Sequence, residues 1–234
     1  MPVVSDEPRA IHIHPTTDLA DRVLLPGDPG RALALAQELL ARPLMFNHNR
    51  GLWGYTGTAC DGGLLTIQST GIGGPSAAIV LEELIALGVT RAVRVGTAGS
   101  VAELSLGELL LVSEAIAADG TSRALGAGER VAADPDLLAA LRLASPEVRC
   151  GAVVSSDLFY EVGEPRFGAW REAGALAVEM EAATLFTVGR LRGIQVACAL
   201  AITDVLTDAR ERIDQAALIE AGLAVGRVGL SALL

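Results

Sequence analysis

The chain has 234 residues, of which 51% are hydrophobic and 20% are charged, and its formal net charge is −10. This length suits one α/β domain over residues 1–234 with a large core, and the acidic balance argues against a nucleic-acid-binding surface. Because no uncharged apolar run reaches 18 residues, we expect no membrane span.

The N-terminus and the cysteines indicate a cytoplasmic protein. The first ten residues, MPVVSDEPRA, are polar and acidic and lack the apolar core of a signal peptide. Cys60, Cys150 and Cys198 lie far apart and form neither a CxxC pair nor a metal-ligand spacing. We therefore expect buried free thiols, no metal site and no disulfide framework.

The first half of the chain alternates strand and helix patterns. A strand in RVLLPGD (22–28) ends in a turn and is followed by a helix in GRALALAQELL (30–40). A second strand in LLTIQSTGIGG (64–74) enters a glycine loop before the helix PSAAIVLEELIALG (75–88), which has proline in its first turn. The strand RAVRVGTAGS (91–100) follows and is predicted to end in its glycines.

The second half continues the alternation. Strands are predicted in ELLLVSEAIAAD (108–119), ALAVEM (175–180) and VACALAITD (196–204), and helices in EAATLFTVGRLRG (181–193) and residues 215–234. This order predicts an α/β fold with a mainly parallel or mixed sheet covered by helices. Ligands of such folds bind at the carboxyl ends of strands.

Three arginines are candidates for binding an anion. Arg31 follows Gly27 by four residues and opens a helix, where backbone N–H groups and the helix dipole favour negative charge. Arg94 is predicted near a strand end, three residues before Thr97 and a glycine turn, a combination that suits a phosphate. Arg50, in HNRGLWGYTG, is the third candidate. No nucleotide-binding glycine motif of the GxGxxG or GxxxxGK[ST] type is present.

Two carboxylates in AVEMEAATL (177–185) interrupt an apolar run. If the segment is extended, Glu179 and Glu181 point to the same side. If a helix begins at Met180, Glu181 lies in its first turn, where the dipole favours a carboxylate. A carboxylate here can also accept hydrogen bonds from the two hydroxyls of a ribose, with the methionine against the sugar.

These motifs together resemble those of the nucleoside phosphorylases. LLPGDPGRA, STGIGGPSAAIVLEEL, VRVGTAGS, SSDLFY, VEMEAATL and AITD occur in the order and spacing of that family, from about residue 12 to the C-terminus. Within it, the chain is most similar to the bacterial hexameric purine nucleoside phosphorylases and their relatives, the uridine phosphorylases. The resemblance implies a single-domain mixed, largely parallel sheet, distorted into a barrel-like form and flanked by helices.

The resemblance also implies roles for individual residues. Phosphate would be bound by Gly27, Arg31, Arg94, Thr97 and, from a neighbouring subunit, Arg50. Ribose would be bound by Met180, Glu181 and a neighbour's His12, with His14 of HIHP as the alternative histidine. The base would contact Ser156, Phe159, Val178 and Glu179. Each site would then need two protomers, and the family's hexamer, a trimer of dimers, is expected.

Asp204 favours a purine as the base. Purine enzymes of this family carry an aspartate at this place, and a carboxylic acid near N7 can protonate the departing base. The family's assisting arginine falls at Ala217, which leaves Arg210 or Arg212 as substitutes. Uridine enzymes instead read the pyrimidine with Gln-x-Arg, for which the nearest match, Glu164-Pro165-Arg166, is offset by one residue.

The sequence therefore predicts a purine nucleoside phosphorylase that converts a purine nucleoside and inorganic phosphate to free base and ribose 1-phosphate without a cofactor. A uridine phosphorylase is the nearest alternative, because GIGGPS and Thr97 look more like that branch. A hydrolytic nucleosidase would not need the three arginines that are expected to bind phosphate. A non-catalytic nucleoside-binding protein would need neither those arginines nor the acid.

Overall fold

The computed structural model describes residues 10–160, 163–206 and 210–234. Its strands are β1 (Arg22–Leu25), β2 (Ala41–Asn47), β3 (Gly54–Thr58), β4 (Leu64–Gln68), β5 (Arg91–Ser100), β6 (Leu109–Ala118), β7 (Arg130–Ala132), β8 (Arg149–Ser156), β9 (Ala175–Glu179), β10 (Gln195–Val205) and β11 (Glu211–Arg212). Its helices are α1 (Pro29–Leu39), η1 (Asn49–Gly51), α2 (Gly74–Ala86), α3 (Gly120–Ala124), α4 (Pro135–Ala144), α5 (Glu164–Glu172), α6 (Ala182–Arg192) and α7 (Gln215–Ser231).

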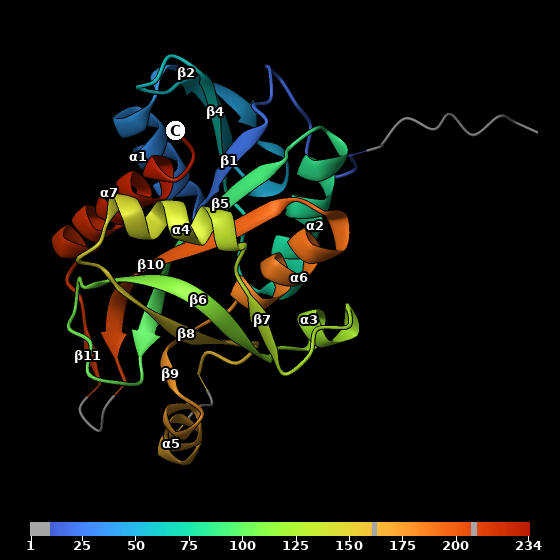
Figure 1. The fold of residues 1–234 in the computed structure, drawn as a ribbon. Helices are drawn as coiled ribbons and strands as arrows, with labels where there is room; N and C mark the ends of the chain where they lie inside the picture. The colour runs from blue at the N-terminus through green and yellow to red at the C-terminus, as the bar shows by residue number, and fades with distance from the viewer. Residues whose placement is uncertain (1–9, 161–162, 207–209) are drawn as a thin grey trace, which may run out of the picture.

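The sheet closes on itself into a barrel-like ring. Its strand order is β11-β10-β6-β8-β9-β5-β1-β4-β3-β2, and β10 also pairs with β5. The ring therefore runs through β10, β6, β8, β9 and β5. The strands β1, β4, β3 and β2 continue the sheet from β5 and do not close on the ring (Figure 1). The pairings β1–β4, β1–β5, β5–β10, β6–β8 and β8–β9 are parallel. The pairings β2–β3, β3–β4, β5–β9, β6–β7, β6–β10 and β10–β11 are antiparallel. The expected mixed, barrel-like sheet is confirmed, although parallel pairings do not predominate in it.

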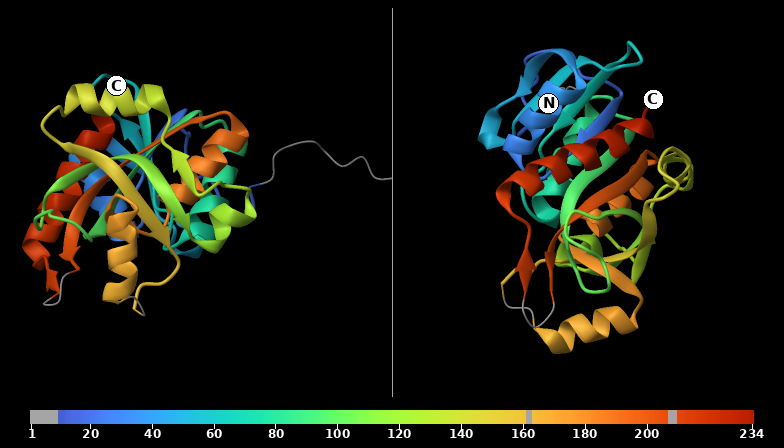
Figure 2. Two further views of the ribbon diagram at one scale, coloured as in Figure 1. Left: turned by 60° about the horizontal axis from the view of Figure 1, so that its bottom comes forward. Right: turned by 90° about the vertical axis from the view of Figure 1, so that its left-hand side faces the viewer.

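Helices cover the two faces of the sheet (Figure 2). On one face α2 packs against α6, over a core that includes Val80, Leu84 and Leu185. On the other face α1 packs against α7, over a core that includes Leu35, Val95 and Val225. The strands read as continuous apolar runs because both of their faces are buried in this way. Helix α5 stands apart at the end of the molecule where β9 begins (Figure 1).

Helix boundaries follow the capping signals in the sequence. Asp28 caps α1 by accepting a hydrogen bond from the backbone N–H of Arg31 at 2.6 Å, and Pro29 occupies the first turn. Helix α6 ends at Gly193, whose φ of 69° is the left-handed conformation that glycine adopts without strain. These caps fix where the loops before α1 and after α6 leave the sheet.

The predicted strand 91–100 is confirmed as β5, but the glycine turn predicted around Thr97 is wrong. β5 continues through these glycines to Ser100 and pairs with β10 along its whole length. Beside its other edge, β1 pairs only with residues 91–94 and β9 only with residues 99–100. In the described chain, the edge of β5 at residues 95–98 therefore has no strand partner on that side. Backbone groups are left free there without a turn.

Candidate functional site

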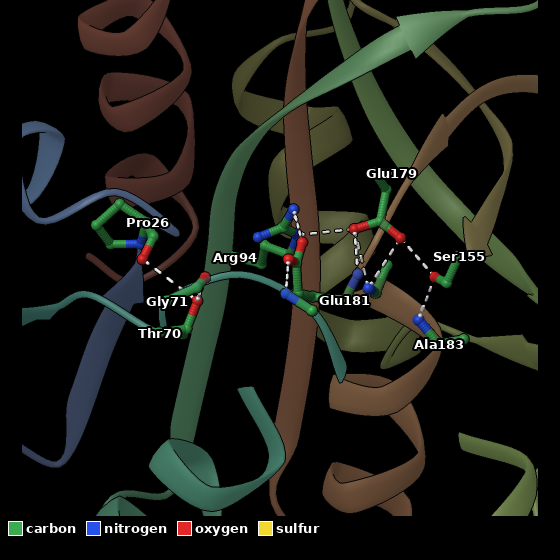
Figure 3. Close-up of polar contacts among 10 residues, drawn as sticks. Pro26, Thr70, Gly71, Arg94, Ser155, Glu179, Glu181 and Ala183 are labelled. Carbon is green, nitrogen blue, oxygen red and sulfur yellow. Dashed lines mark hydrogen bonds and ion pairs between the residues drawn. The ribbon is translucent and has the colours of Figure 1, made fainter. Parts of the chain in front are cut away.

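Arg94 lies in the middle of β5, with only 4% of its surface exposed, and pairs with two carboxylates (Figure 3). Its Nε donates to Glu179 Oε2 at 3.0 Å, and its Nη2 lies 2.5 Å from Glu181 Oε2. Burial opposes the charge of Arg94, but the carboxylates outweigh it and hold the pKa of Arg94 above its usual range. The buried Nη1 has no hydrogen-bond partner among the described residues, so the guanidinium retains a free donor.

Small neighbours create the space that the Arg94 guanidinium occupies. A Cβ atom at Gly96 would lie 2.8 Å from Arg94 Cζ and Nη2, closer than side chains tolerate. Cys198 is the register partner of Arg94 on β10, and burial raises the pKa of its thiol well above the usual range. Neither neighbour was assigned a function from the sequence. A glycine two residues beyond an arginine on the same strand face is the signal that would have identified Gly96.

Glu179 holds the site together. Its side chain is fully buried, and it accepts hydrogen bonds from Ser155 Oγ and from the backbone N–H groups of Glu181 and Ala182, at 2.9 Å and 3.0 Å. Together with Arg94, these donors surround both carboxylate oxygens. These contacts orient Arg94 and the start of α6. The contact of Glu179 with the base stays a prediction.

Glu181 occupies the N-cap position of α6, between the two placements that the sequence allowed. Its Oε2 pairs with Arg94, and its Oε1 accepts a hydrogen bond from the N–H of Gly73 at 2.5 Å. Burial raises the pKa of Glu181 and the charge of Glu179 adds to this rise, while Arg94 opposes it. Two carboxylates thus share one arginine in a buried site. The sequence analysis named both glutamates as site residues, but it did not predict that they share Arg94 as a partner.

The loops after β1 and β4 bring the other predicted anion-binding groups to the same region. The N–H of Gly71 donates to the carbonyl of Gly27 at 3.0 Å, which joins the two glycine loops. Arg31 packs against α7, where a Cβ at Gly222 would lie 3.3 Å from its Nε. Burial lowers the pKa of Arg31, and the positive charge of Arg94 lowers it further. Asp28 opposes this lowering of the Arg31 pKa. The two guanidinium groups are therefore close enough for the charge of Arg94 to act on Arg31.

Thr97 lies on the segment of β5 that pairs with β10 on one edge and has no described strand partner on the other. It is half-buried and follows Arg94 by three residues, so the two side chains point to opposite faces of the strand. The turn predicted around Thr97 is absent, and its contact with the same phosphate as Arg94 stays a prediction.

Asp204 ends β10 and is only 6% exposed. Arg210 Nη2 and Arg212 Nε lie 3.5 Å and 3.6 Å from its Oδ1, and the Thr203 hydroxyl donates to its Oδ2 at 3.1 Å. The sequence left open which arginine accompanies this aspartate, and the structure places both beside it. The arginines shield a nearly buried carboxylate that would otherwise be costly.

Backbone register places Asp204 beside the predicted base-binding residues. Gly99 of β5 pairs with Asp204 on one side and with half-buried Val178 on the other. Phe159 is 44% exposed, and the guanidinium carbon of Arg210 lies 5.5 Å from the centre of its ring. Arg210 thereby connects the aromatic face to the acid.

Ser156 and Met180 lie at the neighbouring strand ends. Ser156 is buried at the end of β8, where its Oγ accepts from the N–H of Leu158 at 3.3 Å, and half-buried Met180 follows β9 directly. In the register, Ser155 pairs with Glu179, so β8 and β9 deliver these residues together. The site thus combines the Arg94 cluster, with its two carboxylates, and an aromatic and acidic half around Asp204.

His12 and Arg50 lie apart from this cluster. The His12 ring pairs with Glu83 through Nδ1 at 2.6 Å, and no described contact joins it to the Arg94 cluster. Arg50 is exposed on η1 with a left-handed φ of 57°, which is strained for a residue with a side chain. His14 is exposed and its Nε2 lies 3.0 Å from the carbonyl of Ile11. Among the described residues, no contact joins these three side chains to Arg94, Glu179 or Glu181.

The remaining expectations concern membranes, metals and thiols. In the part of the chain that the structure describes, no helix is both long and apolar enough to cross a membrane. The same residues contain no group of three or more His, Cys, Asp or Glu side chains placed to hold a metal ion. The cysteines are free, but the expectation that all are buried is wrong, because Cys60 is exposed and Cys150 half-buried.

Comparisons with known proteins agree with this arrangement. The chain is 35% identical to a DeoD-type purine nucleoside phosphorylase of Clostridium novyi, over 83% of this chain and 86% of the relative. It is 36% identical to a uridine phosphorylase of Treponema pallidum, over 80% and 78%. The crystal structure of uridine phosphorylase from Vibrio fischeri in complex with 6-hydroxy-1-naphthoic acid superposes with a TM-score of 0.83, at 32% identity and 92% coverage of both chains. The family model of the phosphorylase superfamily matches residues 21–232, and the chain belongs to that superfamily.

Proposed function

We propose that this protein is a purine nucleoside phosphorylase, which reversibly converts purine ribonucleosides or deoxyribonucleosides and phosphate to free base and the pentose 1-phosphate. Nearly buried Asp204, with Arg210 and Arg212 at one of its oxygens, is the observation that carries this proposal. A purine needs a proton donor when it leaves, and a shielded carboxyl group beside an aromatic face can supply it. A relative that is 35% identical to the chain is named a purine nucleoside phosphorylase.

In the proposed mechanism, the bond between C1′ and the base nitrogen breaks first, and its electron pair leaves with the base. Asp204, which enters the reaction in its protonated form, donates its carboxylic proton to N7 of the purine. It is left as a carboxylate that Arg210 and Arg212 face. The sugar then carries positive charge, which the phosphate anion below it stabilises before its oxygen bonds to C1′. Arg94, with its free Nη1, holds the phosphate together with Gly27, Arg31, Thr97 and a neighbour's Arg50.

In this proposal Glu181 accepts hydrogen bonds from the ribose hydroxyls, and Met180 packs on the sugar. Glu181 pairs with Arg94 and accepts a hydrogen bond from the N–H of Gly73. Phosphate at Arg94 competes for the guanidinium that Glu181 now occupies, which releases carboxylate lone pairs for the ribose hydroxyls. The base stacks on Phe159 beside Ser156 and Val178.

We also propose a homohexamer built as a trimer of dimers, active in purine salvage in the cytoplasm, with each chain folded as one domain. Exposed Arg50 and the pairing of His12 with Glu83 support shared sites, because no described contact joins either residue to the Arg94 cluster of its own chain. Mixing Arg50→Ala with Arg94→Ala protomers under subunit exchange should restore activity to some sites. Exchange without recovery would contradict the shared site.

A uridine phosphorylase remains the second candidate because relatives and solved structures of that name match equally well. The position of Glu164 argues against it. This glutamate opens α5 and pairs with Arg171 on the surface, so it does not provide a pyrimidine-reading amide. Inosine, adenosine and uridine should therefore be assayed with and without phosphate. Phosphate-dependent cleavage of purine nucleosides is expected, and faster cleavage of uridine would overturn the purine assignment.

Asp204→Asn tests the acid directly. The amide cannot donate a carboxylic proton, so adenosine cleavage should fall by about 10²–10⁴-fold. The nucleoside 7-methylguanosine already carries positive charge on its base and should be nearly unaffected. Equal losses for adenosine and 7-methylguanosine would mean that Asp204 shapes the pocket without supplying a proton.

A further inference from the structure

Glu83 makes an unusually complete set of contacts for a helix residue with no assigned role. It lies on α2, and its side chain is 12% exposed. Its Oε2 accepts hydrogen bonds from the backbone N–H groups of His12 and Ile13, at 2.8 Å and 2.7 Å. Its Oε1 lies 2.6 Å from Nδ1 of the His12 ring. One carboxylate therefore fixes both the backbone and the imidazole of the same residue.

The charge of Glu83 is maintained in this position. Burial alone would raise the pKa of Glu83, but hydrogen bonds from Ile13 and His12 outweigh burial and lower it. A carboxylate is an acceptor only, so the ring nitrogen that faces it must carry the proton. The other ring nitrogen, Nε2, has no hydrogen-bond partner among the described residues. In the neutral ring Nε2 is then an acceptor, and its lone pair is available.

The segment that carries His12 is also tied to the turn that carries Arg50. Asn49 Nδ2 donates to the carbonyl of His12 at 2.9 Å, and Asn47 Oδ1 accepts from the N–H of His14 at 2.9 Å. Asn47 is fully buried, so this link does not depend on surface side chains. His12 and Arg50, the two residues expected to serve a neighbouring site, therefore belong to one hydrogen-bonded unit.

We propose that Glu83 is a positioning residue for the reaction: it fixes His12 in the Nδ1–H tautomer, so that Nε2 accepts a hydrogen bond from the 5′-hydroxyl of the nucleoside. This inference rests on the proposed function and on the ribose contact that the family resemblance implies for His12, which is to the 5′-hydroxyl in a neighbouring protomer. A free neutral imidazole samples both tautomers, whereas the carboxylate selects one and fixes the ring orientation. Glu83 itself touches no substrate.

The adjacent residue supplies a matched control. Glu82 lies on the same helix and pairs with exposed Arg192 at 2.7 Å, away from His12. Glu82→Gln and Glu83→Gln remove the same charge from neighbouring positions. Each variant should be assayed with inosine and with 5′-deoxyinosine, which lacks the hydroxyl that His12 is proposed to bind.

Glu83→Gln should lower kcat/KM for inosine by roughly three- to tenfold relative to Glu82→Gln, the usual range for one hydrogen bond. For 5′-deoxyinosine the two variants should differ less than about twofold, because the affected contact is missing. Combining Glu83→Gln with His12→Ala should add no further loss to that of His12→Ala alone. Equal losses on both substrates would assign Glu83 a purely structural role and overturn the proposal.

A second measurement is independent of activity. The chain has only three histidines, so nitrogen NMR of the imidazoles can be assigned with single substitutions. The neutral ring of His12 should be mainly the Nδ1–H tautomer in the native protein and should shift toward Nε2–H in Glu83→Gln. An Nε2–H tautomer in the native protein would overturn the proposal, whatever the substrate. Absence of phosphate-dependent nucleoside cleavage in the native enzyme would instead overturn the proposed function. The tautomer would still show whether Glu83 fixes the protonation of the His12 ring.

Discussion

Replacing Gly96 with alanine should displace Arg94 without touching any charged group. The new Cβ would lie 2.8 Å from Arg94 Cζ and Nη2, and 3.1 Å from Nη1. Ordinary contacts begin near 3.4 Å, so the guanidinium must move by several tenths of an ångström. It cannot swing away freely, because Glu179 and Glu181 hold it at 3.0 Å and 2.5 Å. The methyl group therefore strains two buried ion pairs at once.

The expected loss of stability follows from overpacking, and the expected loss of activity follows from the displacement of Arg94. Overpacking a dense interior costs about 1–3 kcal/mol of unfolding free energy, and each kcal/mol shifts the melting temperature of a protein this size by about 2–4 °C. Displacing a positioned group by about 1 Å can cost 10²-fold in rate. For the smaller shift expected here, kcat/KM for phosphate should fall by roughly 10- to 100-fold.

The assay is a phosphate titration at saturating inosine, combined with thermal unfolding. Gly128→Ala is the matched control, because a Cβ there meets no atom nearer than 3.8 Å. Both substitutions remove the same backbone freedom from the unfolded chain, worth about 0.4–1 kcal/mol. Gly96→Ala with unchanged phosphate kinetics and a melting temperature no lower than that of Gly128→Ala would refute the reasoning.

Two further predictions concern carboxylates. Glu181→Gln should weaken turnover by about 1.5–3 kcal/mol through loss of a charged hydrogen-bond acceptor, yet it should stabilise the fold at pH 8. The raised pKa of Glu181 means that its contribution to stability is present below the unfolded pKa and lost as pH rises through the folded pKa, and glutamine mimics the protonated form. A variant less stable than the native protein at pH 8 would show that the Arg94 pair outweighs burial. Asp61, whose pKa the hydrogen bond from Arg22 lowers from 3.8 to about 2, contributes stability above pH 3.8 that is lost as pH falls toward 2. Asp61→Asn should therefore flatten the acid limb of a melting-temperature profile, and an unchanged limb would contradict this.

Local chemistry made much of the fold predictable. The helix α1 begins where Asp28 and Pro29 signal a start, and α6 ends at Gly193 as its sequence indicates. The prediction around Arg94 was wrong because glycines that read as a turn are instead needed to fit a strand around a guanidinium. A glycine's requirement for space is set by its neighbours across the sheet, which local sequence does not contain.

Glu179 is another residue whose surroundings could not be predicted from the local sequence. Its position next to Met180 and Glu181 indicated a ligand contact, but the partners that bury it come from β5 and β8. Glu83 showed no sequence signal beyond a carboxylate in an apolar helix, because His12 lies 71 residues away. Long-range hydrogen bonds of this kind decide whether a carboxylate meets substrate or holds another residue in place.

The sequence by itself determined the element types, the residue kinds at the strand ends and the family pattern, since these depend on periodicity, caps and motif spacing within short segments. Only the tertiary structure decided that two glutamates share Arg94, that both Arg210 and Arg212 approach Asp204, and that His12 pairs with Glu83. The physical reason is that charge pairing and burial depend on distances between elements far apart in the chain. The closing of the ring between β5 and β10 sets the distances between those elements.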